Sequence, residues 1–298
     1  MKKNINCPLC DKNDYSIILK KKINVIDPVK LYGAANGIKD TQDLVKCNHC
    51  KLIYENPRLD EEIIINGYEN SNEDGHDTQY YLRVKSFYKA ISKIKKKLPE
   101  DPLILDIGSA GGAFIEAAKN HGFKKVEGIE PSNKLCSRSK SRNHKVFNGD
   151  LKGFIKQNKD QKFDLICYWD VIEHLAYPKK ELELAKKIMK DDGLILINFP
   201  DIGTFQAKLF GSNFWWIISV HLVHFTKNTM KEMLSLVGIK TIHISRYWQY
   251  LELGYLIEMA IRLNFFGAKF INKITPTFLK KIPLPYYASQ TTLLGKIK

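Results

Sequence analysis

A chain of 298 residues with 44% hydrophobic residues is long enough for one large α/β domain and a small accessory unit. Its net charge of +15 suits an anionic partner, but the lysines are scattered over every predicted helix, so we do not expect a nucleic-acid site. No apolar run reaches the roughly 18 residues that a membrane span needs, and none follows Met1 as in a signal peptide. We therefore expect a cytoplasmic protein with reduced or metal-bound cysteines.

Two Cys-x-x-Cys pairs mark the start of the chain: Cys7 with Cys10, and Cys47 with Cys50. Four thiolates at this spacing are typical of a closed, tetrahedral Zn²⁺ site, which leaves no position for a reactive water. We assign residues 1–58 to a zinc ribbon and expect it to support folding rather than catalysis.

Residues 59–99 are predicted to form a helical linker and pocket cover. Asp60 is placed to cap a short helix, and a longer helix carries Tyr80 and Tyr81. Aromatic residues at helical spacing are most simply packing residues, although these two tyrosines are also placed to roof a ligand pocket.

A strand, a glycine turn and a helix follow one another from residue 103. The apolar run 103–107 predicts a buried parallel strand, which ends in a turn at Gly108, Gly111 and Gly112. Helical spacing then continues to Gly122. This succession places backbone close to a nucleotide-like ligand at a helix N-terminus, although every doubly wound domain has such turns.

Strands and helices alternate regularly through the rest of the chain. Glu130 ends the second strand and is placed to accept hydrogen bonds from ribose hydroxyls. The pattern predicts an α/β fold with a doubly wound sheet and a last, antiparallel strand. The predicted strands cover residues 103–107, 125–130, 146–147, 163–169, 194–199, 239–247 and 291–298.

Several blocks of residues, taken in order, resemble the class I S-adenosylmethionine-dependent methyltransferases over about residues 78–248. The resemblance implies a seven-stranded Rossmann-like sheet, S-adenosylmethionine as methyl donor, and methyl transfer. One residue departs from the family pattern: Ala110 replaces a glycine, which the fold tolerates if its φ stays negative. The matching blocks are Asp106–Gly112, Glu130, Asp150, Trp169–Leu175 and Gly193–Ile197.

The resemblance also implies roles at the cofactor. Glu130 is expected to hold the ribose hydroxyls, and Asp150 with Leu151 to border the adenine. Trp169 and Asp170 are expected to line the floor beside the sulfonium, and the glycine turn to contact the methionine part. The full set of expected cofactor residues is Tyr80, Asp106, Gly108, Ser109, Gly112, Glu130, Asp150, Leu151, Trp169 and Asp170.

The acceptor side is predicted from the histidines. His174, just past the fourth strand, is the first candidate base, followed by His221 and His224, with Asp170 beside them. Asp170, Glu173, His174 and His224 also resemble the metal set of small-RNA 2′-O-methyltransferases, so a catalytic divalent ion is the alternative. We favour a base without metal.

Two insertions complete the methyltransferase domain, which is assigned to residues 100–298. Residues 201–223 are rich in aromatic side chains and would either form a lid over the acceptor or pack as a surface helix. Residues 251–287 combine apolar and basic side chains, which suits peripheral membrane contact, a subunit contact or a cover on the domain's own core. We expect the cover.

The predicted function is methyl transfer to oxygen or carbon of a small molecule. The Cys pairs followed by Tyr54–Arg58 resemble a subgroup of bacterial zinc-ribbon methyltransferases in glycan, deoxysugar and secondary-metabolite pathways, which implies a sugar or nucleotide sugar as acceptor. The alternatives are an RNA methyltransferase and a non-catalytic partner module that retains the cofactor fold. The oligomeric state stays open.

Overall fold

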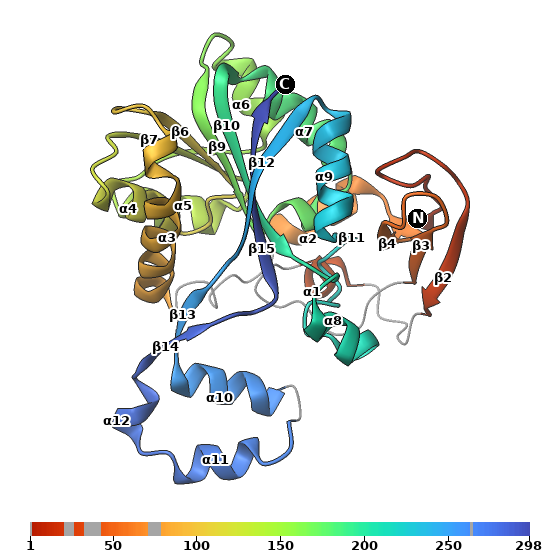
Figure 1. Cartoon of the computed structure of the whole chain (residues 1–298), viewed down its shortest axis with the longest axis vertical. Helices are drawn as coiled ribbons and strands as arrows, with labels where there is room; N and C mark the ends of the chain where they lie inside the picture. Colours follow the sequence, from red (N-terminus) through yellow and green to blue (C-terminus); the bar gives the residue numbers. More distant parts are fainter. Residues whose placement is uncertain (1, 21–26, 33–42, 71–78, 263–264) are drawn as a thin grey trace.

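The computed structural model describes residues 2–20, 27–32, 43–70, 79–262 and 265–298. A seven-stranded sheet forms its centre (Figure 1). Strand β15 pairs antiparallel with both of its neighbours, and the other strand pairs of this sheet are parallel. The predicted Rossmann-like α/β fold with a mixed sheet is therefore confirmed. In spatial order the strands are β12 (Ile239–Arg246), β15 (Gln290–Ile297), β10 (Met189–Pro200), β9 (Phe163–Trp169), β6 (Leu103–Ile107), β7 (Lys125–Glu130) and β8 (Lys145–Asn148).

Helices cover both faces of this sheet because successive strand residues point to opposite sides. In β9, for example, Leu165 and Cys167 pack into one core, while Ile166 and Tyr168 pack into the other. One face is covered by α3 (Tyr80–Ile94), α4 (Ala113–Asn120) and α5 (Asn133–Ser141). The other face is covered by α6 (Leu151–Gln157), α7 (Pro178–Lys187) and α9 (Lys227–Leu236).

The sequence predicted most ends of helices and strands to within a few residues. Two departures have a clear physical reason. Strand β10 begins at Met189, before the predicted start, because a register shift before Leu194 keeps the acidic turn within the strand. Asp60 does precede helix α2 (Glu61–Glu69), but its side chain makes no cap hydrogen bond and instead pairs with Lys3 Nζ at 2.6 Å.

The N-terminal ribbon is a four-stranded sheet in which one strand comes from far along the chain. Strand β11 is contributed by residues that sequence patterns assign to the lid insertion and the segment after it, and it pairs antiparallel with β4. The ribbon is therefore hydrogen-bonded to the methyltransferase domain. Its strands in spatial order are β11 (Val223–His224), β4 (Ile53–Glu55), β3 (Leu44–Cys47) and β2 (Tyr15–Leu19), and nearby lie β1 (Lys2–Lys3), β5 (Arg58–Leu59) and α1 (Pro28–Tyr32).

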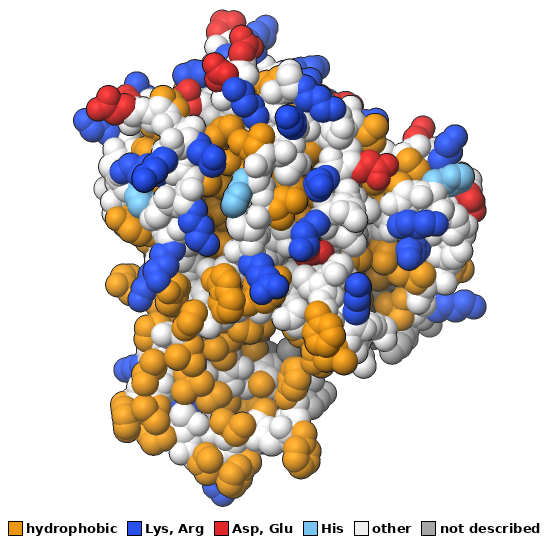
Figure 2. Space-filling view, in the orientation of Figure 1, with side chains coloured by type: hydrophobic (Ala, Val, Ile, Leu, Met, Phe, Trp, Pro, Cys, Tyr) orange, Lys and Arg blue, Asp and Glu red, His pale blue; other side chains and the backbone are white. Residues whose placement is uncertain are grey.

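The three helices of the second insertion stand away from the central sheet (Figure 1), so they do not form the expected cover on the domain's own core. The strand that leads to them packs on α3, where the Tyr250 amide donates to Ser86 Oγ at 2.8 Å. A two-stranded ribbon carries three short helices, and Figure 2 shows hydrophobic side chains over much of their surface. Within the described residues, no helix is long and apolar enough to cross a membrane. These elements are β13 (Gln249–Glu252), α10 (Leu253–Arg262), α11 (Ala268–Ile274), α12 (Thr277–Lys280) and β14 (Pro283–Tyr286); α8 (Phe205–Phe210) lies in the first insertion.

Candidate functional site

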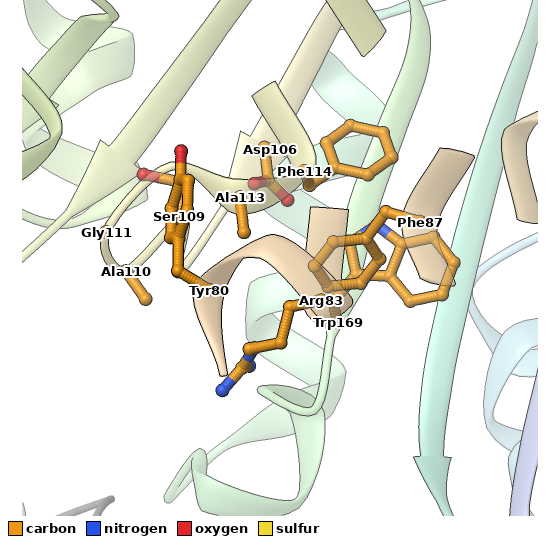
Figure 3. Close-up of a pocket in the computed structure, with 11 residues that line it drawn as sticks. Tyr80, Arg83, Phe87, Asp106, Ser109, Ala110, Gly111, Ala113, Phe114 and Trp169 are labelled. Carbon is orange, nitrogen blue, oxygen red and sulfur yellow. The ribbon is translucent and has the colours of Figure 1, made fainter. Parts of the chain in front are cut away.

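A pocket lies where the parallel strands end, between the glycine turn and helix α3 (Figure 3). The turn after β6 forms one side, and Trp169 at the end of β9 closes another. The lining residues are Tyr80, Arg83, Phe87, Asp106, Gly108, Ser109, Ala110, Gly111, Ala113, Phe114 and Trp169.

The glycine turn passes close to the segment that follows β9. Gly108 has φ +69°, and a Cβ at this position would lie 2.5 Å from Val171 Cγ2, so only glycine fits. Ala110 also has a positive φ, +46°, which corrects the expectation of a negative value. The alanine is held in this conformation by its backbone amide, which donates to Glu130 Oε2 at 2.8 Å.

Glu130 lies fully buried behind the turn. Its second oxygen, Oε1, accepts a hydrogen bond from the backbone amide of Ser132 at 2.8 Å. The neighbouring Asp106 is also buried, and burial together with the charge of Glu130 raises the pKa of the Asp106 carboxyl well above its usual value. Two acidic groups therefore lie against the same turn.

The opposite wall comes from α3 and from aromatic packing. Phe87 lies 4.9 Å from the Trp169 ring, centroid to centroid, and the Arg142 guanidinium lies 3.9 Å from the Tyr80 ring centroid. Tyr81 is 77% exposed and is not among the residues that line the pocket. Sequence analysis missed Arg83 and Phe87, although their spacing from Tyr80 places all three on one helix face.

Five predicted cofactor residues lie outside the pocket lining: Gly112, Glu130, Asp150, Leu151 and Asp170. Asp150 caps α6 by accepting from the Gly153 amide at 2.7 Å, and Leu151 is buried in the core. Asp170, with φ +55°, accepts hydrogen bonds from Asn198 Nδ2 at 2.7 Å and Gln290 Nε2 at 2.6 Å.

The charge of Asp170 depends on its surroundings. Burial raises the pKa of the Asp170 carboxyl to about 6, while the charge of Arg83 opposes this rise. The Asn198 and Gln290 hydrogen bonds described above also favour the carboxylate. Arg83, a wall residue of the pocket, thus acts electrostatically on the segment that leads to the histidines.

Glu173, His174 and His221 form a cluster whose potential ligand atoms lie within 4.8 Å of one another. The Glu173 carboxylate is buried, and neither oxygen has a hydrogen-bond partner among the described residues. His221 Nδ1 lies 2.8 Å from the Trp216 carbonyl oxygen, which orients the ring. Burial lowers the pKa of His221 well below its usual value, so the ring is neutral and Nδ1 is the donor.

His224 does not belong to this cluster, which corrects the predicted metal set. It lies in β11 opposite Ile53, and its ring centroid is 6.2 Å from that of His221. Asp170 is occupied by two amide side chains. Of the predicted set, Glu173 and His174 are brought together, and His221 takes the third place.

The four ribbon cysteines converge as predicted, with all Sγ atoms within 4.8 Å of one another. Cys7 Sγ lies 3.4 Å from Cys50 Sγ, and Cys10 Sγ lies 3.5 Å from Cys47 Sγ. These distances exclude disulfides, whose S–S bond is about 2.05 Å. They are close to the roughly 3.8 Å between sulfurs that four Zn–S bonds of about 2.3 Å require in a tetrahedron.

The fold and the glycine turn define a Rossmann-like domain, and comparison with known proteins gives its class. The family model described as "Methyltransferase domain" matches residues 75–244, more than half of the chain. The chain therefore belongs to this family, the class I S-adenosylmethionine-dependent methyltransferases, and contains an enzyme domain.

Individual relatives are more distant. The chain is 27% identical to a mitochondrial ubiquinone biosynthesis O-methyltransferase of Dictyostelium discoideum, over 39% of this chain and 41% of the relative. It is 32% identical to an uncharacterized protein of Methanocaldococcus jannaschii, over 41% of this chain and 57% of the relative. The match thus spans about half the length of these curated relatives.

A solved structure shows the same fold. The crystal structure of an S-adenosylmethionine-dependent methyltransferase from Archaeoglobus fulgidus is similar with a TM-score of 0.51. The two chains are 18% identical, and the similarity covers 73% of this chain and 97% of that one.

Proposed function

We propose that the protein transfers the methyl group of S-adenosylmethionine to a small-molecule acceptor. The pocket between the glycine turn and α3 carries this proposal, since it lies at the strand ends where α/β sheets bind ligands. Gly108 lines this pocket, so the backbone of the turn would lie beside the methionine part. Glu130 would accept hydrogen bonds from the ribose, and Trp169 would lie beside the sulfonium.

The other proposed contacts follow from position along the same edge. Asp106, Ser109 and Gly112 would complete the turn around the methionine part, and Tyr80 would cover it. Asp150 and Leu151 would border the adenine, and Asp170 would lie near the transferred group. The bound cofactor supplies an electrophilic methyl group on a positively charged sulfur.

The chain must align the acceptor atom with the methyl group and take its proton. We propose that His174 accepts this proton. It lies three residues after Val171, whose side chain is next to Gly108 at the pocket. The ring of His221 lies 4.9 Å from that of His174, centroid to centroid. Burial and the charge of Asp170 raise the pKa of the Glu173 carboxyl well above its usual value, and once ionised this group would stabilise a protonated His174. His224 and Asp170 would shape this site from outside the cluster.

The orphaned Glu173 carboxylate favours a second interpretation of the same cluster, a divalent cation site. A carboxylate and two imidazoles form a donor set for such ions, and His221 already directs Nδ1 to a carbonyl, as metal-ligating histidines do. A cation there would orient a hydroxyl acceptor and lower its pKa.

An Mn²⁺ titration followed by electron paramagnetic resonance separates the two interpretations. A cation site predicts one bound Mn²⁺ that Glu173→Gln abolishes and that Glu127→Gln, a buried change elsewhere, retains. Full turnover in chelator with no Mn²⁺ signal would leave His174 as a base without metal.

The ribbon cysteines are proposed to hold a structural Zn²⁺. Their four sulfurs have the spacing that a tetrahedral thiolate site needs, so the residues fit this ion. We propose that residues 1–58 form the ribbon around this ion. Residues 59–99 would then be the linker and pocket cover, and residues 100–298 the methyltransferase domain.

We propose a sugar or nucleotide sugar as the acceptor. The support is the resemblance of the Cys pairs and Tyr54–Arg58 to zinc-ribbon methyltransferases of glycan and deoxysugar pathways. The Dictyostelium discoideum relative, whose name gives it O-methylation in ubiquinone biosynthesis, supports a small acceptor with a hydroxyl group. An RNA acceptor is less favoured, because Arg83 is the one basic residue among those lining the pocket. On the face seen in Figure 2 the basic side chains are dispersed rather than gathered.

Labelled S-adenosylmethionine and separate pools of nucleotide sugars, catechols and mixed RNA test the proposal by mass spectrometry. We expect label on a nucleotide sugar, no transfer by His174→Ala, and normal transfer by His243→Ala, a change at an exposed histidine. The cofactor affinity of His174→Ala should equal that of the unmodified protein. Labelled RNA would support the RNA alternative, and absent cofactor binding by calorimetry would support a non-catalytic module.

A further inference from the structure

The three helices of the second insertion form an appendage, here residues 253–282, that extends from the sheet domain on strands β13 and β14 (Figure 1). Few of its side chains are buried; Ile257 and Ala268 are the buried hydrophobic residues among those described. The appendage therefore has a small core of its own and presents most of its side chains to the surroundings.

Large apolar side chains gather on this appendage. Phe266 is fully exposed and Phe278 is 71% exposed. Single exposed apolar residues are ordinary, but a gathered set marks an interaction surface. Figure 2 shows this set as the main hydrophobic region of the visible face. Its members are Phe265, Phe266, Phe270, Ile271, Ile274, Phe278 and Ile282.

The charged side chains of the appendage are basic with one exception, the exposed Glu258 of α10. From Met259 to Lys298 the sequence contains no Asp or Glu. Lys269, Lys273 and Lys281 are exposed beside the apolar residues. Exposed apolar side chains accompanied by an excess of lysines complement an anionic phospholipid surface, where the rings enter the acyl boundary and the lysines meet phosphates.

The appendage is linked to the candidate site by aromatic contacts. The Phe265 ring lies 5.9 Å from the Phe210 ring in α8, and Phe210 lies 5.5 Å from Trp215, centroid to centroid. The backbone carbonyl of the next residue, Trp216, accepts the hydrogen bond from His221 Nδ1. A succession of side-chain and backbone contacts therefore connects the appendage with the acceptor cluster.

We propose that the appendage docks peripherally on an anionic phospholipid bilayer. Phe266, Phe270 and Phe278 enter the interface, and Lys269 and Lys273 contact the headgroups. The helices are too short to span, so the attachment is reversible and lies in the plane of the surface. This inference does not depend on the proposed methyl acceptor.

Vesicle flotation of the full chain tests it. We expect co-flotation with phosphatidylcholine vesicles that contain phosphatidylglycerol, and much less with phosphatidylcholine alone. The triple variant Phe266→Ser, Phe270→Ser, Phe278→Ser should lower the partition coefficient by about tenfold or more, since each ring contributes buried apolar area. The three side chains are exposed, so the variant should fold. Circular dichroism and thermal melting check that it does.

Matched controls use similar residues on other surfaces. Ile18→Ser, Leu236→Ser and Ile242→Ser change residues that are 47%, 52% and 44% exposed, and this triple variant should float normally. Charge reversal at Lys269, Lys273 and Lys281 should weaken flotation, whereas reversal at Lys93, Lys96 and Lys97 should not.

Absence of flotation, or equal loss in the controls, would overturn the proposal. A second copy of the chain is the other occupant to test. If analytical ultracentrifugation shows a dimer that the triple Phe variant converts to monomer, with no vesicle binding by the unmodified protein, the face is a subunit contact and the membrane proposal is wrong.

Discussion

The Glu130 carboxylate joins the end of strand β7 to the turn after β6, because Oε2 accepts the Ala110 amide at 2.8 Å. Oε1 accepts the Ser132 amide in the same way. One buried acid thus fixes both loops at the pocket edge, where the ribose of a bound cofactor is expected. The residue has a structural task and a proposed binding task at once.

Glu130→Gln should weaken S-adenosylmethionine binding by about 1–3 kcal/mol, because an amide replaces one charged acceptor oxygen and leaves a donor facing a donor. Isothermal titration calorimetry measures the change. Glu127→Gln is the matched control, since Glu127 lies buried on the same strand but pairs with Lys145 and Gln161. Equal affinity in both variants would remove Glu130 from the binding site.

Ala110→Gly should leave stability unchanged or raise it by up to about 1.6 kcal/mol. Relief of the left-handed conformation gains roughly 1–2 kcal/mol, and the greater freedom of glycine in the unfolded chain costs about 0.4–1 kcal/mol. Ala117→Gly in α4 is the control and should destabilise by about 1 kcal/mol. Chemical denaturation compares them, and an equal loss in both would contradict the positive φ of Ala110.

Elemental analysis should find about one zinc per chain in protein prepared without chelator. Cys47→Ser should lose the metal and lower the melting temperature, because the bound ion would hold β3 and the two Cys-x-x-Cys turns together. Cys136→Ser, a change at a buried cysteine in α5, should keep the full zinc content. Zinc-free unmodified protein of normal stability would refute the structural site.

His224 should make the protein less stable in acid. Burial lowers the pKa of its imidazole to about 4, whereas the unfolded chain has a pKa near 6.5. The unfolded chain therefore binds more protons between these values, and the stabilisation present above pH 6.5 is lost as the pH falls towards 4. Over this range the free energy of unfolding should fall by up to about 3 kcal/mol more in the unmodified protein than in His224→Phe.

Denaturant unfolding at several pH values measures this difference. Comparison within each pH cancels acid effects that both proteins share, such as loss of metal from the ribbon. His243→Phe, at an exposed position, should retain the slope of the unmodified protein. If His224→Phe also retains it, the buried imidazole is not the acid-sensitive group.

The central sheet could be predicted because its signals are local. Strand β9 begins and ends where its apolar run does, at Phe163 and Trp169, and Gly122 and Gly238 end the helices before them in the left-handed conformation. Gly108 was evident for the same reason, since a turn after a buried strand needs that backbone.

The site could be predicted only in part, because the rest depends on pairing between distant segments. His224 enters the ribbon sheet opposite Ile53, which leaves His221 as the histidine beside Glu173. No local pattern distinguishes these two residues. Arg83 reaches the pocket only because α3 packs across the turn, and the exposure of Phe266 depends on where the β13–β14 ribbon carries its helices.

Leu222, the residue before strand β11, joins the backbone of the ribbon to that of the candidate acceptor site. The Leu222 amide donates to the Glu173 carbonyl at 2.9 Å, and the Leu222 carbonyl accepts the Glu55 amide at 2.9 Å. Any free energy that metal binding adds to the ribbon is therefore coupled to the position of Glu173. Linkage is reciprocal, so an acceptor that orders the Glu173 cluster should also tighten the hold of the ribbon on its zinc.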